Sequence, residues 1–403
     1  MGTNKEKKIH RRRKRSNSNR KKIHPHRNRA NPKAKKINQR GNRIQRTRKR
    51  SEKVLVDSIK VNGYYKEFYT NEVVRFAVPK GDPPQWLDFV IPPEWDKDHK
   101  FKNSYVRVVE NGSVHLRQVY EVPMLFVMAP NNKLLSDMVF HNYWNYFNPE
   151  KIPPYTFLDE TIGLLAWAGE DNYWHWLHDI LPRFHLLQLS GIKIDRYLLP
   201  RLYLPFHFEA IQKLGIPADK IIQIDTNMHI RAKNLVVPSV PFNIGTSVKW
   251  PCDFIRRTFL GNGNITKIDG YDRIYISRQD AKWRKVINEE EVMGFLEKKG
   301  FKKVVLKNLS IQRQMEIFSS AQFIISPNGA GLANLFFCNP ATKVIQLFDK
   351  TSDEFVKIAN YLNLDYYLLK CKTAPPPSTI HEVMNNLLVD ITKLSNVLSR
   401  LGI

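Results

Sequence analysis

The stretch from Asn172 to Arg183 sets polar side chains at helical spacing within an otherwise apolar sequence. His175 and Asp179 lie four residues apart, a spacing at which two side chains touch on a helix. A carboxylate in contact with an imidazole orients the ring and raises its basicity, so the pair could act as a general base on a hydroxyl group. A helical wheel places Asn172 and Arg183 on the same polar stripe and His178 at its margin.

Two other interpretations of this stripe stay open. Its polar side chains could be buried at a domain interface for structural reasons alone. His175, His178 and Asp179 could also ligate a metal ion, but the sequence offers no further ligand, and we expect none to be bound. We interpret His185 and His207 as ordinary packed or surface histidines.

A second group of candidates surrounds a turn made by Gly329, Ala330 and Gly331, which separates two apolar stretches. A strand before the turn and a helix after it would leave backbone N–H groups unpaired at the carboxyl end of a sheet. Glycines let a diphosphate approach such amides closely, and Asn328 and Asn334 could add donors. The dinucleotide fingerprint fits poorly because Asn334 replaces its third small residue, so we do not expect a nicotinamide enzyme. A simple tight turn is the alternative.

Four cationic residues follow an expected strand at 273–278. They are Arg278, Lys282, Arg284 and Lys285. In a parallel sheet this loop opens on the same edge as the glycine turn, so cations could face the helix amides across one anion. Guanidinium groups suit a departing diphosphate because they stay charged and bind oxygens in pairs. A solvated basic loop is the alternative.

Short apolar runs alternate with helical runs from Leu158 onwards, which is typical of a parallel sheet covered by helices. We therefore predict an α/β fold with domains at 54–251 and 270–377, joined by a segment rich in Gly and Asn; the part before residue 150 is hard to interpret. The expected strands are 196–204, 234–239, 273–278, 303–306, 323–326 and 343–348, with a further strand fed by 215–224, and the expected helices are 171–187, 205–215, 288–299, 310–321 and 332–337.

Two helices carry recognisable start signals. Asn288 and Glu291 would form a capping box for the helix at 288–299, and Thr379 and Glu382 would do so for a terminal helix at 378–403. Apolar residues recur in the terminal segment at steps of three and four, so we predict an amphipathic helix packed on the fold. Membrane binding is the alternative, although the polar face is not enriched in Lys or Arg.

The N-terminal segment 1–53 holds 23 Lys and Arg against two Glu and so carries most of the formal net charge of +26. It has almost no large apolar residues to offset the entropy of ordering, and we predict a disordered basic tail. Such a charge density predicts salt-dependent binding to a polyanion, whether nucleic acid, an anionic membrane surface or an acidic polymer.

The three cysteines, Cys252, Cys338 and Cys371, show no spacing typical of a zinc site or a disulfide framework. No apolar run reaches the length of a transmembrane segment, and the basic N-terminus is not followed by the apolar core of a secretory signal. We expect a cytoplasmic protein that the tail could hold at an anionic membrane surface.

Three stretches taken in order resemble the glycosyltransferase family 61 proteins, which include bacterial polysaccharide-type transferases and eukaryotic O-linked N-acetylglucosamine and plant xylosyl transferases. The likeness covers roughly residues 155–350 and leaves out the tail and residues 54–150. The stretches read "EDNYWHWLHDILPRF", "YISRQDAKWRKVINEEEV" and "FSSAQFIISPNGAGLANLFF".

The resemblance implies a GT-B fold, in which two Rossmann-like domains face each other and a C-terminal helix crosses back to the first. It implies inverting transfer from a nucleotide sugar, usually uridine-linked, to a hydroxyl of a glycan or protein acceptor, with no cofactor or metal required. By position, His175, Asp179 and His178 would be catalytic, Asn172 and Arg183 would lie on the acceptor side, and the donor would be bound by Arg278, Lys282, Arg284, Ser326, Asn328, Gly329, Ala330, Gly331 and Asn334.

In the expected mechanism, His175 paired with Asp179, or Asp179 itself, takes the acceptor proton, and Arg278 and Arg284 stabilise the leaving diphosphate. Two positions depart from the family's pattern. Asn328 stands where a His is frequent, and Gln346 stands where an acidic residue is frequent. We expect nucleotide binding to survive both changes.

Two rival functions remain. The chain could be a polyanion-binding protein that acts through its tail and uses the α/β body as a scaffold. A hydrolase is the second rival, but the chain lacks a Gly-x-Ser-x-Gly elbow and a supported carboxylate pair. We interpret the Asp-x-Asp sequence at Asp96 and Asp98 as a surface turn.

Overall fold

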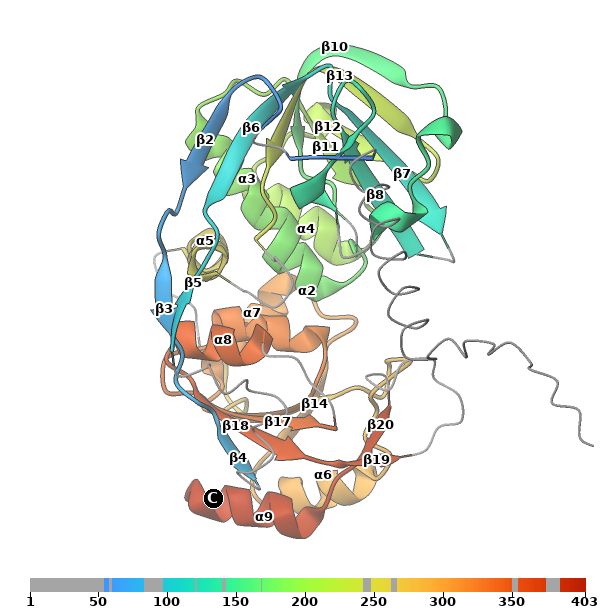
Figure 1. Ribbon diagram of the computed structural model, residues 1–403. Helices are drawn as coiled ribbons and strands as arrows, with labels where there is room; N and C mark the ends of the chain where they lie inside the picture. The colour runs from blue at the N-terminus through green and yellow to red at the C-terminus, as the bar shows by residue number, and fades with distance from the viewer. Residues whose placement is uncertain are drawn as a thin grey trace, which may run out of the picture. The chain divides into compact units, whose positions relative to one another are not determined.

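Ten strands form a first, mixed sheet (Figure 1). The computed structural model describes residues 54–57, 60–82, 97–119, 122–139, 143–167, 169–241, 248–261, 267–349, 354–374 and 385–403, all within one compact unit that spans Ser51–Ile403. The predicted tail at 1–53 and its polyanion site, the Thr379 and Glu382 capping box, and Asp96 therefore lie outside the described residues. The division into domains at 54–251 and 270–377 stays a prediction.

The first sheet joins a parallel half to an antiparallel half. The parallel strands are β10 (Thr156–Leu164), β11 (Arg196–Pro200), β12 (Ile221–Ile224) and β13 (His229–Pro238). The remaining strands come from residues 55–135 and are β1 (Leu55–Val56), β2 (Tyr65–Phe68), β6 (Ser104–Glu110), β7 (Ser113–Val119), β8 (Val122–Met128) and β9 (Leu134–Leu135). Of these, β6 and β7 pair with β13 and run antiparallel to it. The parallel strands confirm the alternation predicted from Leu158 onwards.

One continuous helical stretch follows β10. It consists of α2 (Tyr173–His175), the π-helix η6 (Trp176–Ile180) and α3 (Leu181–Ser190). The side chain of Asn172 caps its start by accepting from the N–H of Trp174. Within η6, the N–H of Leu181 donates to the carbonyl of Trp176, five residues back. The predicted helix is therefore present, with one turn of π geometry in its centre.

The second sheet contains six strands, all parallel, in the order β15 (Lys302–Val305), β14 (Arg273–Ser277), β16 (Phe323–Pro327), β17 (Lys343–Phe348), β18 (Asp365–Lys370) and β4 (Lys80–Asp82). The chain passes from β14 to β15 on one side and then to β16 on the other. The boundary between β14 and β16 is therefore a topological switch point, where ligands bind in open α/β sheets.

Helices cover both faces of the second sheet. The helices α7 (Ile311–Ser320), η8 (Ala330–Phe337) and α8 (Glu354–Tyr361) share a core with Ile274 and Ile276 of β14. On the other face, α6 (Glu289–Glu297) and α9 (Ile391–Arg400) share a core with Tyr275 (Figure 1). This alternation along β14 is the period of two expected for a strand buried on both faces.

The C-terminal region differs from the prediction in extent and position. The helix expected at 378–403 is only α9, which Asp390 caps, and β20 (Asn386–Leu388) precedes it. Its buried side chains Leu394, Val397 and Leu398 pack with α6 on the second sheet, so the expected crossing to the first domain is wrong. The helix α9 stays on the second sheet because this apolar stripe is already covered there.

One local prediction also needs correction. Asn288 makes no side-chain cap for α6, because its side chain exchanges hydrogen bonds with the backbone of Val389 and donates to Glu291. The helix α5 (Lys249–Leu260) contains Pro251, because proline is tolerated in the first turn of a helix. The helix α4 (Pro205–Leu214) is confirmed.

Residues before β6 complete the second sheet. The strand β4 pairs with β18, and Lys80 Nζ lies 2.9 Å from Asp365 Oδ1. Just before β4, the N–H of Ala77 donates to Asn360 Oδ1 at 2.7 Å, and Asn360 Nδ2 donates to the Ala77 carbonyl at 3.2 Å. The connection between the sheets is thus made by the N-terminal half of the chain.

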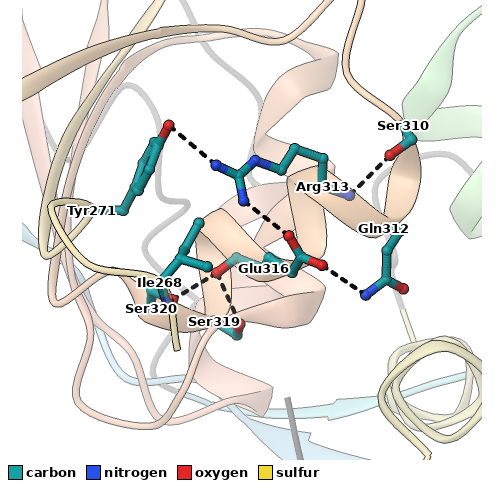
Figure 2. A network of polar contacts seen from close by, with 8 residues as sticks. All are labelled: Ile268, Tyr271, Ser310, Gln312, Arg313, Glu316, Ser319 and Ser320. Atoms are coloured by element: carbon teal, nitrogen blue, oxygen red, sulfur yellow. Dashed lines mark hydrogen bonds and ion pairs between the residues drawn. The ribbon is translucent and has the colours of Figure 1, made fainter. Parts of the chain in front are cut away.

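The helix α7, which borders the switch point, is fixed by a network of polar contacts (Figure 2). Ser310 caps it by accepting from the N–H of Arg313, whose guanidinium donates to Glu316 at 3.0 Å. The carbonyl of Glu316 accepts from Ser320, which itself accepts from the N–H of Ile268 at 3.0 Å. The segment before β14 is therefore tied to α7.

No helix among the described residues is both long enough and apolar enough to cross a membrane.

The link between Ala77 and Asn360 gives a stability prediction. Asn360→Ala removes three hydrogen bonds, two to the backbone of Ala77 and one to the carbonyl of Val356, each worth about 1 kcal/mol, so the free energy of unfolding should fall by about 2–3 kcal/mol in urea denaturation. Lys80→Ala breaks the partly exposed ion pair with Asp365 and a hydrogen bond to the hydroxyl of Tyr367, and should cost less than about 1 kcal/mol. Equal losses in the two variants would contradict this account of the link.

Candidate active site

Asp179 lies between two imidazoles. Its Oδ2 is 2.7 Å from Nδ1 of His175, and its Oδ1 is 2.9 Å from Nδ1 of His178. The side chains of Asp179 and His178 are fully buried, whereas that of His175 is 23% exposed. His175 is therefore the member of this triad that a substrate can reach, and the buried carboxylate acts through it.

The surroundings change the pKa values of both members of the pair. Burial alone would lower the pKa of His175, but the hydrogen bond and the charge of Asp179 outweigh it and hold that pKa above its ordinary value. Burial alone would raise the pKa of Asp179, but the hydrogen bonds from the two histidines hold it below its ordinary value. Asp179 is thus ionised and acceptor-only, so both imidazoles donate to it from Nδ1.

Close packing fixes the orientation of both rings. The rings of Trp174, His178 and Phe336 pack together: Trp174 stacks on His178, with centroids 4.4 Å apart, and Phe336 lies nearly parallel to both. Gly169, at φ +85°, packs directly against His175, and a Cβ there would lie 2.8 Å from Cδ2 of the ring. Only glycine fits this position. Sequence analysis missed Gly169, although a glycine six residues before a candidate base was a usable signal.

The π-helix divides the predicted polar stripe. Arg183 is fully buried, and its guanidinium donates to the carbonyls of Leu165, Ala166 and Pro238. Its expected place on the acceptor side is therefore wrong. The extra residue in the π turn shifts the phase of the helix after Asp179, so a wheel of 100° per residue no longer applies. Asn172 stays exposed at the start of α2.

On the second sheet, the guanidinium of Arg278 lies against the backbone of Gly329. A Cβ at Gly329 would lie 1.9 Å from Nη1 of Arg278, so only glycine allows this approach. Nη2 of Arg278 donates to the carbonyl of Trp283 at 3.1 Å. Burial and the nearby charge of Arg284 lower the pKa of Arg278 to about 10, which leaves it cationic at neutral pH. The predicted pairing of the basic loop with the glycine turn is present.

Arg284 lies beside two carboxylates that sequence analysis missed. Burial lowers its pKa, and the charges of Asp349 and Glu354 oppose that shift. Asp349 follows β17 and Glu354 begins α8, so neither belongs to the loop of Arg284. The sequence held no local signal for them, because their approach depends on the order of the strands. Lys282 is exposed and lies over the ring of Trp283.

A cavity of about 310 Å³ lies at the switch point between β14 and β16. Its wall includes the predicted residues Arg278, Ser326 and Gly331, and Lys307 adds a cation. From the first half of the chain, the wall takes Asp171 and Tyr173, which flank the start of the helix that carries His175, together with Leu204, Pro205 and Phe206. The cavity therefore borders both the start of the helix that carries His175 and the loop of Arg278, while the side chain of His175 itself is not part of its wall.

Asn334 connects the same two regions from within. It is fully buried, accepts from the hydroxyl of Tyr173 at 3.0 Å, and donates to Gln314 at 2.7 Å and to the carbonyl of Gly331. The expected contact of Asn334 with the nucleotide-sugar donor is wrong, because the hydrogen bonds of its amide group are all made inside the protein. Asn328 and Ala330 lie in the turn as predicted, and the N–H of Asn328 donates to the carbonyl of Leu347.

Gln346 is a core residue of β17. It is fully buried and accepts from the hydroxyl of Tyr366 at 2.7 Å.

The two histidines interpreted as ordinary residues have structural contacts. The buried ring of His207 forms hydrogen bonds with the backbone at Tyr203, Leu204 and Glu170. His185 lies within hydrogen-bond distance of the hydroxyl of Tyr69. Among the described residues, no group of three or more His, Cys, Asp or Glu side chains could hold a metal ion.

Residues 173–345 match the model of the family described as Glycosyltransferase 61. The matched segment includes His175, Asp179, Arg278 and the glycine turn, and it stops before Asp349 and Glu354. It lies within the likeness that the three sequence stretches predicted. No curated protein matches the chain.

The triad gives a prediction for the titration of His175. Its imidazole should titrate above its ordinary pKa of about 6.5 when followed by NMR. In Asp179→Asn the effect of burial is opposed only by the smaller contributions of the Glu354 and Asp171 charges, so the midpoint should fall. Asp253→Asn removes a carboxylate from an ion pair with Lys249 and should leave the midpoint unchanged. A midpoint that does not move in Asp179→Asn would show that the carboxylate does not control the ring.

Proposed function

Residues 173–345 of this chain belong to glycosyltransferase family 61, and on that premise we propose that the protein is an inverting glycosyltransferase. It would move a sugar from a nucleotide donor, UDP-linked, to a hydroxyl of a glycan or protein acceptor. The observation that supports this most is the cavity whose wall combines Arg278 and the glycine turn with the start of the helix that carries His175.

His175 is the proposed general base. With Nδ1 donating to Asp179, its neutral ring presents Nε2 as the proton acceptor. The acceptor oxygen forms a bond to the anomeric carbon as the bond from that carbon to the diphosphate breaks, and the acceptor proton passes to Nε2. Asp179 stabilises the resulting imidazolium, and His178 holds Asp179 from its other oxygen.

The leaving diphosphate needs positive charge on the opposite side. Arg278 supplies a guanidinium that stays protonated at neutral pH, and its contact with Gly329 sets it beside the amides that begin η8. A buried guanidinium binds a diphosphate strongly because little water competes. The proposed reaction therefore includes no metal ion and no cofactor.

The wider arrangement is part of the same proposal. We assign the two sheets to the two domains of a GT-B fold, with the donor bound at the switch point of the second sheet. We also propose a cytoplasmic enzyme that the basic segment 1–53 brings to a polyanionic surface; its excess of Lys and Arg supports this.

Isothermal titration with UDP tests the proposal. UDP should bind the wild-type protein, and Arg278→Ala should weaken binding by about 10- to 100-fold, because a charge-assisted hydrogen bond is worth about 1.5–3 kcal/mol. Lys298→Ala removes an exposed cation at the end of α6 and should change the affinity by less than about threefold. Absence of binding by UDP and by every other nucleoside diphosphate would contradict the proposed function.

A further inference from the structure

Two oppositely charged side chains near the candidate active site have no role in the reaction as described above. Arg284 belongs to the loop after β14, and Glu354 begins α8, after β17. These loops open on one edge of the second sheet, because β14, β16 and β17 are parallel neighbours in that order. Their side chains lie close enough for the charge of Glu354 to act on Arg284.

Both side chains carry a buried polar atom that is unpaired within the described part of the chain. These atoms are Nε of Arg284 and Oε2 of Glu354. Burying a charged group without a hydrogen bond costs several kcal/mol, so such atoms call for an explanation. Since one atom is a donor and the other an acceptor, a ligand that satisfies both must offer an acceptor and a donor.

The position of Glu354 indicates which part of a substrate would contact its side chain. The ring of Phe355, the residue after Glu354, packs against that of Trp174, the residue before His175, with centroids 5.2 Å apart. Glu354 therefore lies on the side of the proposed base, and its charge acts on both His175 and Arg284. In a direct displacement, the anomeric carbon lies between the base and the leaving diphosphate. A side chain beside the base therefore borders the sugar ring of the donor.

The charges favour a sugar over a diphosphate at this point. Glu354 and Asp349 would repel a diphosphate, whereas a carboxylate readily accepts from hydroxyl groups. Asp349 is held by Thr373 Oγ1 at 3.1 Å and by Asn385 Nδ2 at 3.3 Å, and its charge opposes that of Arg284. Arg278, which contacts Gly329, is the cation left for the diphosphate.

We propose that Glu354 and Arg284 bind hydroxyl groups of the sugar that is transferred, and so select the donor sugar. Oε2 of Glu354 accepts from one hydroxyl, and Nε of Arg284 donates to a hydroxyl oxygen. The inference rests on the proposed function and changes the role of Arg284, which the sequence assigned to the diphosphate. It also places a determinant of specificity beyond the segment that matches the family.

The test compares UDP with UDP-sugars in isothermal titration. Glu354→Gln keeps the size of the side chain but removes its charge, so UDP should bind within about twofold of wild type. The affinity advantage of the preferred UDP-sugar over UDP, found from UDP-glucose, UDP-N-acetylglucosamine and UDP-xylose, should fall about tenfold or more. Glu290→Gln, at an exposed position in α6, should change neither affinity.

A second variant, Arg284→Asn, tests the same proposal in case Glu354→Gln does not fold. Arg284 has φ +58°, a conformation that asparagine tolerates, so Arg284→Asn removes the guanidinium with little backbone strain. It should also lose the advantage of the UDP-sugar while keeping most of the affinity for UDP.

The outcomes separate this inference from the proposed function. If wild type binds UDP and a UDP-sugar but both variants keep the sugar-dependent advantage, the inference is wrong and the proposed function stands. Equal weakening of UDP and UDP-sugar would also overturn it, because the two residues would then act on the nucleotide. If wild type binds neither ligand, both proposals fail together.

Discussion

The interaction that the rest of the site depends on is the contact of the buried Asp179 with two histidines. A carboxylate with no exposure must be hydrogen-bonded, and here one imidazole donates to it from within the core while the other reaches the surface. Both contacts are made where a π turn lies between α2 and α3. This turn contains His178 and Asp179, whose side chains are hydrogen-bonded to each other. The same turn directs Arg183 into the core.

A second constraint joins this helix to the second sheet. Asn334 accepts from Tyr173 and donates to Gln314, so the start of α2, the turn before η8 and the helix α7 are held by one buried amide. Tyr173 and Gln314 also line the cavity at the switch point. The helix that carries His175 and the glycine turn beside Arg278 are therefore held by a shared set of contacts, although they come from opposite halves of the chain.

Contacts that depend on the local spacing of residues could be predicted from the sequence. A separation of four residues indicated the contact of His175 with Asp179, and the glycine turn and basic loop followed from the alternation of strands and helices. Contacts set by strand order or by packing were not predictable: Glu354 reaches Arg284 only through the order of β14, β16 and β17. One local signal before residue 150 misleads, since an Asn-Gly pair often predicts a hairpin. Asn111 and the following glycine instead join β6 to β7 while both strands run along β13 in one register.

The central claim is that His175 serves the chemical step while Arg278 serves the nucleotide. The most direct test measures UDP release from a UDP-sugar with water as acceptor, together with UDP affinity, in His175→Ala. The account predicts a rate at least about 100-fold lower than wild type and an unchanged affinity for UDP, as expected for loss of a general base. An unchanged rate, or an equal loss of rate and of affinity, would contradict it.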